Sequence, residues 1–134
     1  MSKRKQRKLP SFSSSIGDFC NMVEGAKRDY KWNSDEIDRL DNLTQDYLHQ
    51  LELGNLSYSE RAKIATKLAE CRRLRRESKD TVTNLQPFID FIESDKGKQT
   101  MNLMREALGK TRKVEEGMKR RSYRFRVLDE ADII

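Results

Sequence analysis

The chain has 134 residues, of which 37% are charged, 35% hydrophobic and only 7% aromatic, and its net charge is +6. This length supports one domain of about 100–200 residues, and so few apolar side chains favour elongated helices that each bury one stripe. No apolar run approaches the ~20 residues of a membrane span, and the basic N-terminus lacks the apolar stretch of a signal peptide. With two cysteines, we expect a reduced, cytoplasmic protein without membrane contact.

Charge is divided unevenly along the chain. Residues 18–60 contain ten acidic and four basic side chains, whereas residues 61–126 contain nineteen basic and nine acidic ones. An acidic segment followed by a strongly basic one indicates either a negatively charged partner or pairing between the two segments.

The first elements differ in their periodicity. Residues 1–14, MSKRKQRKLPSFSS, mix bases, serines and a proline without a repeat, so we expect a flexible basic tail. Ser15 and Asp18 have the spacing of a capping box, and the apolar positions that follow predict a short helix to about Tyr30.

Two longer helices are predicted next. Asn33 provides a second start signal, and the helix that follows is predicted to end at Gly54, as a residue that tolerates positive φ. Ser57 begins a third helix that meets no breaker before Pro87, so this central helix would have about 28 residues and a length on the order of 40 Å.

The last part of the chain changes period. Pro87 suits the first position of a short apolar helix, residues 95–97 predict a turn, and apolar positions from Met101 to Met118 predict a further helix. Residues 123–127 alternate between apolar and basic side chains, as a strand does. The predicted fold is therefore all-α: an elongated helical hairpin or bundle of the coiled-coil kind over residues 15–122, followed by a short strand or an extended tail over residues 123–134.

Two short motifs imitate a nucleotide-driven motor. Leu108–Thr111 reads LGKT, but a phosphate-binding loop needs a glycine where Met104 stands, and the segment has a helical pattern. Val127–Asp132 reads VLDEAD, but the strands and helices of a motor fold do not accompany it. His49 is the only histidine, and Cys20 and Cys71 lie at apolar helical positions. We therefore expect no enzyme, no metal and no cofactor.

The segment CRRLRRESKD places basic side chains on one face of the central helix. On a helical wheel, Arg61 joins them in a stripe about 100° wide, which could follow a phosphate backbone. The alternatives are ion pairs with the aspartates of the preceding helix or with an acidic protein. The residues of this stripe that we predict to bind nucleic acid are Arg72, Arg75, Arg76 and Lys79.

Two further basic clusters lie near the chain ends, and neither has acidic neighbours in sequence. Tyr123 and Phe125 of the second cluster could stack on exposed bases, although packing is the alternative. The predicted contacts are Lys3, Arg4, Lys5, Arg7 and Lys8 in the first cluster, and Lys119, Arg120, Arg121, Tyr123, Arg124, Phe125 and Arg126 in the second.

The stretch Leu43–Asp80 resembles small helical proteins encoded by phages of Gram-positive bacteria. In those proteins a helix with a similar QD-LH-LEL pattern precedes a longer helix with an Arg-Arg and Lys-Asp pattern, and the later segment LGKTRKVEEGMKRRSY is similar in style. The resemblance implies work in the host cytoplasm: support of DNA replication or recombination, control of transcription, or interference with a host defence protein.

The sequence therefore predicts a non-enzymatic accessory protein that binds nucleic acid through its phosphates, without reading bases. One alternative is a protein-interaction module, such as a phage inhibitor of a host protein. Another is an oligomer that sequesters a small anionic nucleotide, which requires Arg72, Arg76 or Arg121 to converge in a pocket. We also expect self-association, because long amphipathic helices with few large apolar side chains need another surface to cover.

Overall fold

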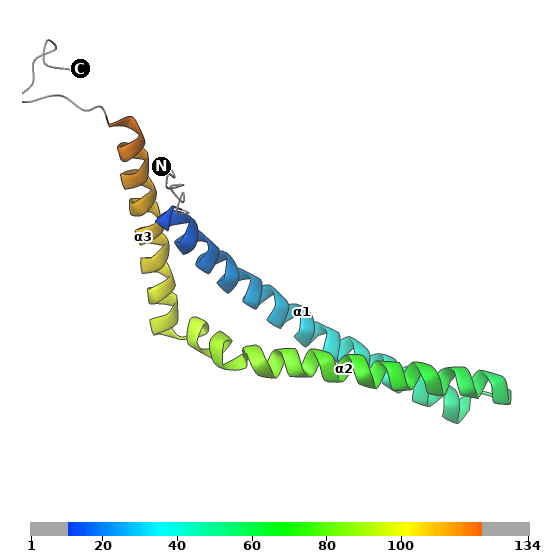
Figure 1. Cartoon of the computed structure of the whole chain (residues 1–134). Helices are drawn as coiled ribbons and strands as arrows, with labels where there is room; N and C mark the ends of the chain where they lie inside the picture. Colours follow the sequence, from blue (N-terminus) through cyan, green and yellow to red (C-terminus); the bar gives the residue numbers. More distant parts are fainter. Residues whose placement is uncertain (1–10, 122–134) are drawn as a thin grey trace, which may run out of the picture.

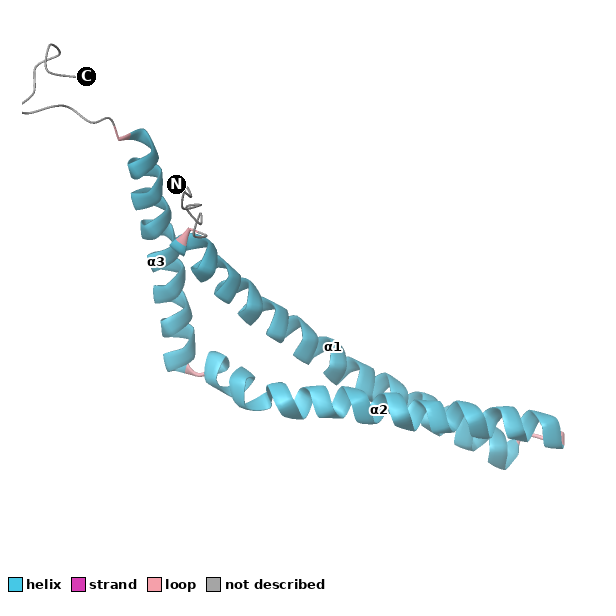
Figure 2. Cartoon of the chain, in the orientation of Figure 1, coloured by secondary structure: helices cyan, strands magenta, loops and turns pink. Residues whose placement is uncertain are grey.

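The computed structural model describes residues 11–121, and within this range the chain consists of three helices joined by short connections: α1 (Phe12–Leu53), α2 (Tyr58–Glu93) and α3 (Asp95–Arg120) (Figure 2). The predicted all-α fold is confirmed. Helix α1 has 42 residues and is therefore about 63 Å long. The predicted C-terminal strand or tail, residues 123–134, lies outside the described residues.

Helices α1 and α2 form an elongated antiparallel hairpin. They lie side by side near their connection and diverge toward the opposite end, where α3 runs from the end of α2 back to the N-terminal part of α1 (Figure 1). The three helices therefore share contacts at one end of the molecule, and the other end is a two-helix hairpin.

Helix α1 begins earlier than predicted and runs without a break. Ser11 is its N-cap and accepts a hydrogen bond from the Ser14 amide, so residues 12–14 belong to the helix and the predicted start at Ser15 is wrong. The predicted second start at Asn33 is also wrong, because Asn33 lies inside α1 and its side-chain amide donates to the Asp29 carbonyl at 2.8 Å. Asn33 could cap a helix, but its side chain bonds to the backbone within α1 instead.

The connection between α1 and α2 follows the sequence signals closely. Gly54 ends α1 as predicted, but with φ −82° and ψ 140°, so positive φ is not the reason for glycine. The reason is a close approach, because a Cβ at Gly54 would stand 2.5 Å from the Gln50 carbonyl oxygen. Ser57 begins α2 as predicted: its hydroxyl oxygen accepts from the Glu60 amide at 3.2 Å and its O–H donates to the Glu60 carboxylate at 3.0 Å.

Pro87 does not begin a new helix, so that prediction is wrong. It lies inside α2, which changes direction near its C-terminal end (Figure 1). Proline has no N–H for the Thr83 carbonyl, and its ring crowds the preceding turn. Ile89 and Ile92 are buried just beyond it, and their burial holds the last turns of α2 in the helix.

A single residue, Ser94, joins α2 to α3. Its hydroxyl oxygen accepts from the Gly97 amide at 3.0 Å and its O–H donates to the Phe91 carbonyl, so one side chain caps both helices. The predicted turn at residues 95–97 is wrong, because these residues form the first turn of α3. A Cβ on Gly97 would stand 1.8 Å from the Phe91 carbonyl oxygen and 2.7 Å from the Ile92 Cα, so this corner requires glycine.

The core lies where the three helices meet. Val23 of α1, Ile89 and Ile92 of α2, and Met101 of α3 are buried together there. The half-buried residues packed against them are Cys20, Tyr30, Leu85 and Phe88. Only Val23 and Leu40 among the large side chains are fully buried in the described part of the chain, so the core is thin.

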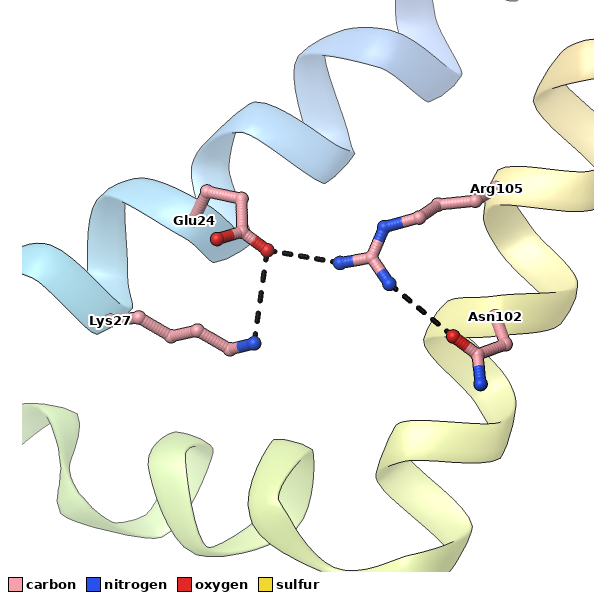
Figure 3. Close-up of polar contacts among 4 residues, drawn as sticks. All are labelled: Glu24, Lys27, Asn102 and Arg105. Carbon is pink, nitrogen blue, oxygen red and sulfur yellow. Dashed lines mark hydrogen bonds and ion pairs between the residues drawn. The ribbon is translucent and has the colours of Figure 1, made fainter.

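Polar contacts at two points hold α3 against α1. Figure 3 shows Arg105 of α3 donating to the Glu24 carboxylate of α1 at 2.9 Å, with Lys27 3.7 Å from the same oxygen and Asn102 3.5 Å from the other arm of Arg105. Near the start of α1, the Glu115 carboxylate accepts hydrogen bonds from both the amide and the hydroxyl of Ser13. These contacts fix the angle at which α3 crosses α1.

Candidate nucleic-acid interface

A groove of about 610 Å³ lies between α1 and α2. Helix α2 forms one wall and helix α1 the other. The α2 wall consists of Arg72, Arg75, Arg76, Lys79 and Asp80, and the α1 wall consists of Asp41, Asn42, Thr44, Gln45 and Leu48. We call these ten residues the hairpin groove.

The α2 wall brings together the four basic residues that the sequence predicted on this helix. Their spacing of three and four residues keeps them on adjacent turns of one face. Arg75 donates to the Asp41 carboxylate across the groove at 2.6 Å. Arg72, Arg76 and Lys79 make no ion pair within residues 11–121. Arg61, at the start of α2, is not part of the groove lining.

Pairing with the aspartates of α1 was the alternative explanation for this basic stripe. Of Asp35, Asp38, Asp41 and Asp46, only Asp41 forms an ion pair within the described part of the chain. Asp80 adds a second carboxylate to the groove. The hairpin groove therefore contains four cations and two carboxylates, and it keeps a positive balance.

The α1 wall carries residues that sequence reasoning missed. The side-chain amides of Asn42 and Gln45 are exposed and form no hydrogen bond to any residue between 11 and 121. The Thr44 hydroxyl is occupied, because it donates to the Leu40 carbonyl at 2.8 Å. The sequence did not mark Asn42 and Gln45 as site residues, because exposed amides are common on helices. Their position opposite the arginines of α2 is what distinguishes them.

The opposite flank of the hairpin has a different charge pattern. Arg73 of α2 lies 2.8 Å from Glu77 and 3.7 Å from Glu70, so its charge is balanced locally. On α1, a hydrogen bond from Arg39 holds the pKa of the Glu36 carboxyl below its usual value. This flank consists of matched pairs, in contrast to the hairpin groove.

The second predicted cluster is only partly described. A depression of about 740 Å³ between the start of α1 and the end of α3 includes Arg112, Lys119 and Arg120. Arg120 lies 2.8 Å from Glu116, so the expectation that this cluster has no acidic neighbours in sequence is wrong at Arg120. Arg121 is exposed at the end of α3. The predicted contacts that lie outside the described residues are Lys3, Arg4, Lys5, Arg7, Lys8, Tyr123, Arg124, Phe125 and Arg126.

The short motifs can now be placed. Gly109, Lys110 and Thr111 lie within α3, which confirms the predicted helix and leaves no loop of amides to surround a phosphate. The VLDEAD motif lies outside the described residues. His49 is exposed and Cys71 is buried, and no three His, Cys, Asp or Glu side chains within residues 11–121 gather where they could hold a metal ion.

Comparisons of the chain with protein-family models, with curated proteins and with solved structures give no match. The resemblance to phage proteins therefore stays a prediction from the sequence. None of the helices in the described part of the chain is both long and apolar enough to span a membrane. The fold and the groove together describe an all-α helical hairpin that carries a basic groove on one flank.

Proposed function

We propose that this chain is a non-enzymatic accessory protein that binds nucleic acid through phosphate contacts in the hairpin groove. The observation that carries the proposal is the gathering of Arg72, Arg76 and Lys79 in one groove without ion pairs to other described residues. Unpaired guanidinium groups bind phosphate oxygens through two parallel donors, and this geometry suits a backbone contact.

The spacing of these cations fits a nucleic-acid strand. Lys79 lies seven positions after Arg72, which corresponds to about 10 Å along the axis of α2. Phosphates on one strand of a duplex follow each other at about 3.4 Å along its axis, so the groove spans about three of them. The basic clusters near the chain ends would add further contacts that do not depend on base sequence.

The biological setting is also part of the proposal. A basic helical protein of this kind would support replication, recombination or transcription in the cytoplasm, and in the host cytoplasm if a phage encodes it. It would also self-associate, because large apolar side chains such as Phe12, Trp32 and Met118 are exposed in the described part of the chain. Light scattering during gel filtration tests the self-association, and a monomer at micromolar concentration would contradict it.

A second candidate is a protein-interaction module. The observation that favours it is the apolar character of the hairpin end, where Leu53 is 80% exposed and Tyr58 is 90% exposed. Apolar side chains gathered at an exposed end are typical of a surface that docks on another protein. An inhibitor of a host protein could use this end and leave the hairpin groove unoccupied.

A third candidate is sequestration of a small anionic nucleotide. It requires basic side chains to converge in a pocket, and Arg72 and Arg76 do line one groove. Arg121, at the end of α3, is not part of that lining. A groove open on one side holds a free nucleotide less completely than the enclosed pockets that usually bind small ligands.

Fluorescence anisotropy with labelled single- and double-stranded oligonucleotides across a salt series tests the proposed function. We expect binding at low salt and a linear fall of log affinity with log salt, whose slope counts the phosphates neutralised. Absence of binding to both oligonucleotides at low salt would contradict nucleic-acid binding, and co-purification from host lysate would then test the protein-interaction module.

A further inference from the structure

We propose that the hairpin groove takes a single-stranded segment of nucleic acid, with phosphates on the α2 wall and the edge of an unpaired base on the α1 wall. This assignment rests on the proposed function and names the class of nucleic acid that it binds. It goes beyond backbone neutralisation, because it gives Asn42 and Gln45 a direct contact with bases.

The two walls of the groove differ in chemistry. On the α2 wall, Arg72, Arg76 and Lys79 offer donors and no acceptors, which suits phosphate oxygens, and Asp80 adds one carboxylate beside them. The α1 wall offers the amides of Asn42 and Gln45, each with both donors and an acceptor. A ligand that matches both walls must present an anionic edge on one side and a mixed donor and acceptor edge on the other. A nucleotide unit does so.

The side-chain amides of Asn42 and Gln45 are available to contact a base. Both side chains are exposed, and neither donates to or accepts from another described residue. Leu48, on the same wall and 43% exposed, offers an apolar surface to a sugar or to the face of a base. On binding a base, these amides exchange only hydrogen bonds to water, because no hydrogen bond to another described residue has to break.

We infer a single strand for a geometric reason. In B-DNA, amide side chains read paired bases from an element that enters the major groove, whereas Asn42 and Gln45 line a groove between two helices. In an RNA helix the major groove is too narrow for side chains to enter. An unpaired base presents its Watson–Crick edge to the protein. The groove volume of about 610 Å³ lies within the ~300–1,000 Å³ of ordinary ligand pockets, so it accommodates a nucleotide unit but no paired helix.

One carboxylate in the groove also favours this arrangement. Asp41 is occupied by Arg75 at 2.6 Å, whereas Asp80, which follows Lys79 on α2, forms no ion pair within residues 11–121. A carboxylate repels phosphate and accepts hydrogen bonds from the exocyclic amino groups of cytosine and adenine. A ligand made of phosphate alone therefore matches this groove less well than a nucleotide does.

The test measures binding of a labelled single strand of about 12 nucleotides and of the duplex of equal length by the full chain at matched salt. The informative variant is Asn42→Ala with Gln45→Ala, and the control is Gln50→Ala, an exposed amide of α1 outside the groove lining. All three changes are neutral, so the charge of the protein is unaltered. Circular dichroism confirms that each variant is folded.

We expect the wild type to bind the single strand about tenfold more tightly than the duplex. The double variant should lower single-strand affinity about fivefold or more and leave both the salt slope and the duplex affinity unchanged. The Gln50→Ala control should match the wild type. This pattern separates base contacts from phosphate contacts.

Two results would overturn the inference while leaving the proposed function in place. They are equal or tighter binding of the duplex and an unchanged single-strand affinity in the double variant. Displacement by a nucleoside monophosphate as effective as that by unlabelled strand would overturn both, because it would assign the groove to a free nucleotide. A failure to bind either oligonucleotide at low salt would overturn the proposed function itself.

Discussion

The Nε atom of Arg75 on α2 lies 2.6 Å from a carboxylate oxygen of Asp41 on α1, and this ion pair crosses the hairpin groove between residues 34 positions apart in sequence. The side chains of the pair are 37% and 50% exposed, so its contribution to stability is about 0–1 kcal/mol. Its larger effect is electrostatic, because Asp41 neutralises one of the four cations that line the groove.

Replacing Asp41 by Asn should therefore strengthen nucleic-acid binding. The change releases Arg75 and adds one positive charge to the groove, so we expect affinity at low salt to rise about threefold, with a slope of log affinity against log salt steeper by about 0.7–0.9. A salt series measured by fluorescence anisotropy checks both values. Weaker binding with an unchanged melting temperature would show that Asp41 itself contributes to the contact.

Gly97 should be irreplaceable at the corner between α2 and α3. An added Cβ would stand 1.8 Å from the Phe91 carbonyl oxygen, which is a backbone atom and cannot turn aside. We expect Gly97→Ala to lower the free energy of unfolding by at least about 2 kcal/mol, as overpacking of a closed site does. Urea unfolding followed by circular dichroism measures this loss.

The matched control for the corner is Gly109→Ala in the same helix. A Cβ at Gly109 meets nothing within 4 Å, and alanine favours a helix interior over glycine by about 1 kcal/mol. Gly109→Ala should therefore stabilise the protein by about that amount. Equal effects of the two substitutions would mean that α3 does not meet α2 through the tight corner described above.

The contact between Glu115 and Ser13 should make the start of α1 sensitive to acid. Hydrogen bonds from the Ser13 hydroxyl and amide lower the pKa of the Glu115 carboxyl below its usual 4.5. The unfolded chain takes up this proton at higher pH than the folded chain does. The stabilisation is therefore complete above pH 4.5 and is lost as the pH falls through the folded-state pKa.

This acid sensitivity can be followed at the Ser13 amide by nuclear magnetic resonance. Its chemical shift should titrate with a midpoint below 4.5 in the wild type, and this titration should be absent in Glu115→Gln. Glu116→Gln is the control, because Glu116 faces Arg120 instead of Ser13. A wild-type midpoint at or above 4.5 would contradict the contact.

The amphipathic pattern was sufficient to predict the fold class and the hairpin. The start of α2 at Ser57 and the end of α1 at Gly54 depend on contacts within a few residues, and both boundaries occur where predicted. Asn33 and Pro87 also have the local pattern of a helix start, but tertiary packing outweighs that local preference. Helix α1 passes Asn33 without a break, and the burial of Ile92 holds α2 beyond Pro87.

The candidate site was predictable on one wall only. Arg72, Arg75, Arg76 and Lys79 share a helix face by spacing alone, and the structure places all four in one groove. Which aspartate of α1 would face them depends on the register between two long helices, and helical periodicity within each helix does not determine that register. The same register decides that Asn42 and Gln45 oppose the arginines.

The most direct test of phosphate binding in the hairpin groove compares two variants with charge removed from adjacent positions of α2. In the first, Arg72→Gln, one cation leaves the groove. In the second, Arg73→Gln, one cation leaves the opposite flank, where Glu77 lies 2.8 Å away. Each is measured against a labelled single strand across a salt series.

We expect Arg72→Gln to lose affinity about three- to fivefold at low salt and its salt slope to become shallower by about 0.7, and Arg73→Gln to stay within about twofold of the wild type. Equal losses in both variants would indicate a diffuse attraction to overall charge. Full affinity in the groove variant would contradict binding in the hairpin groove.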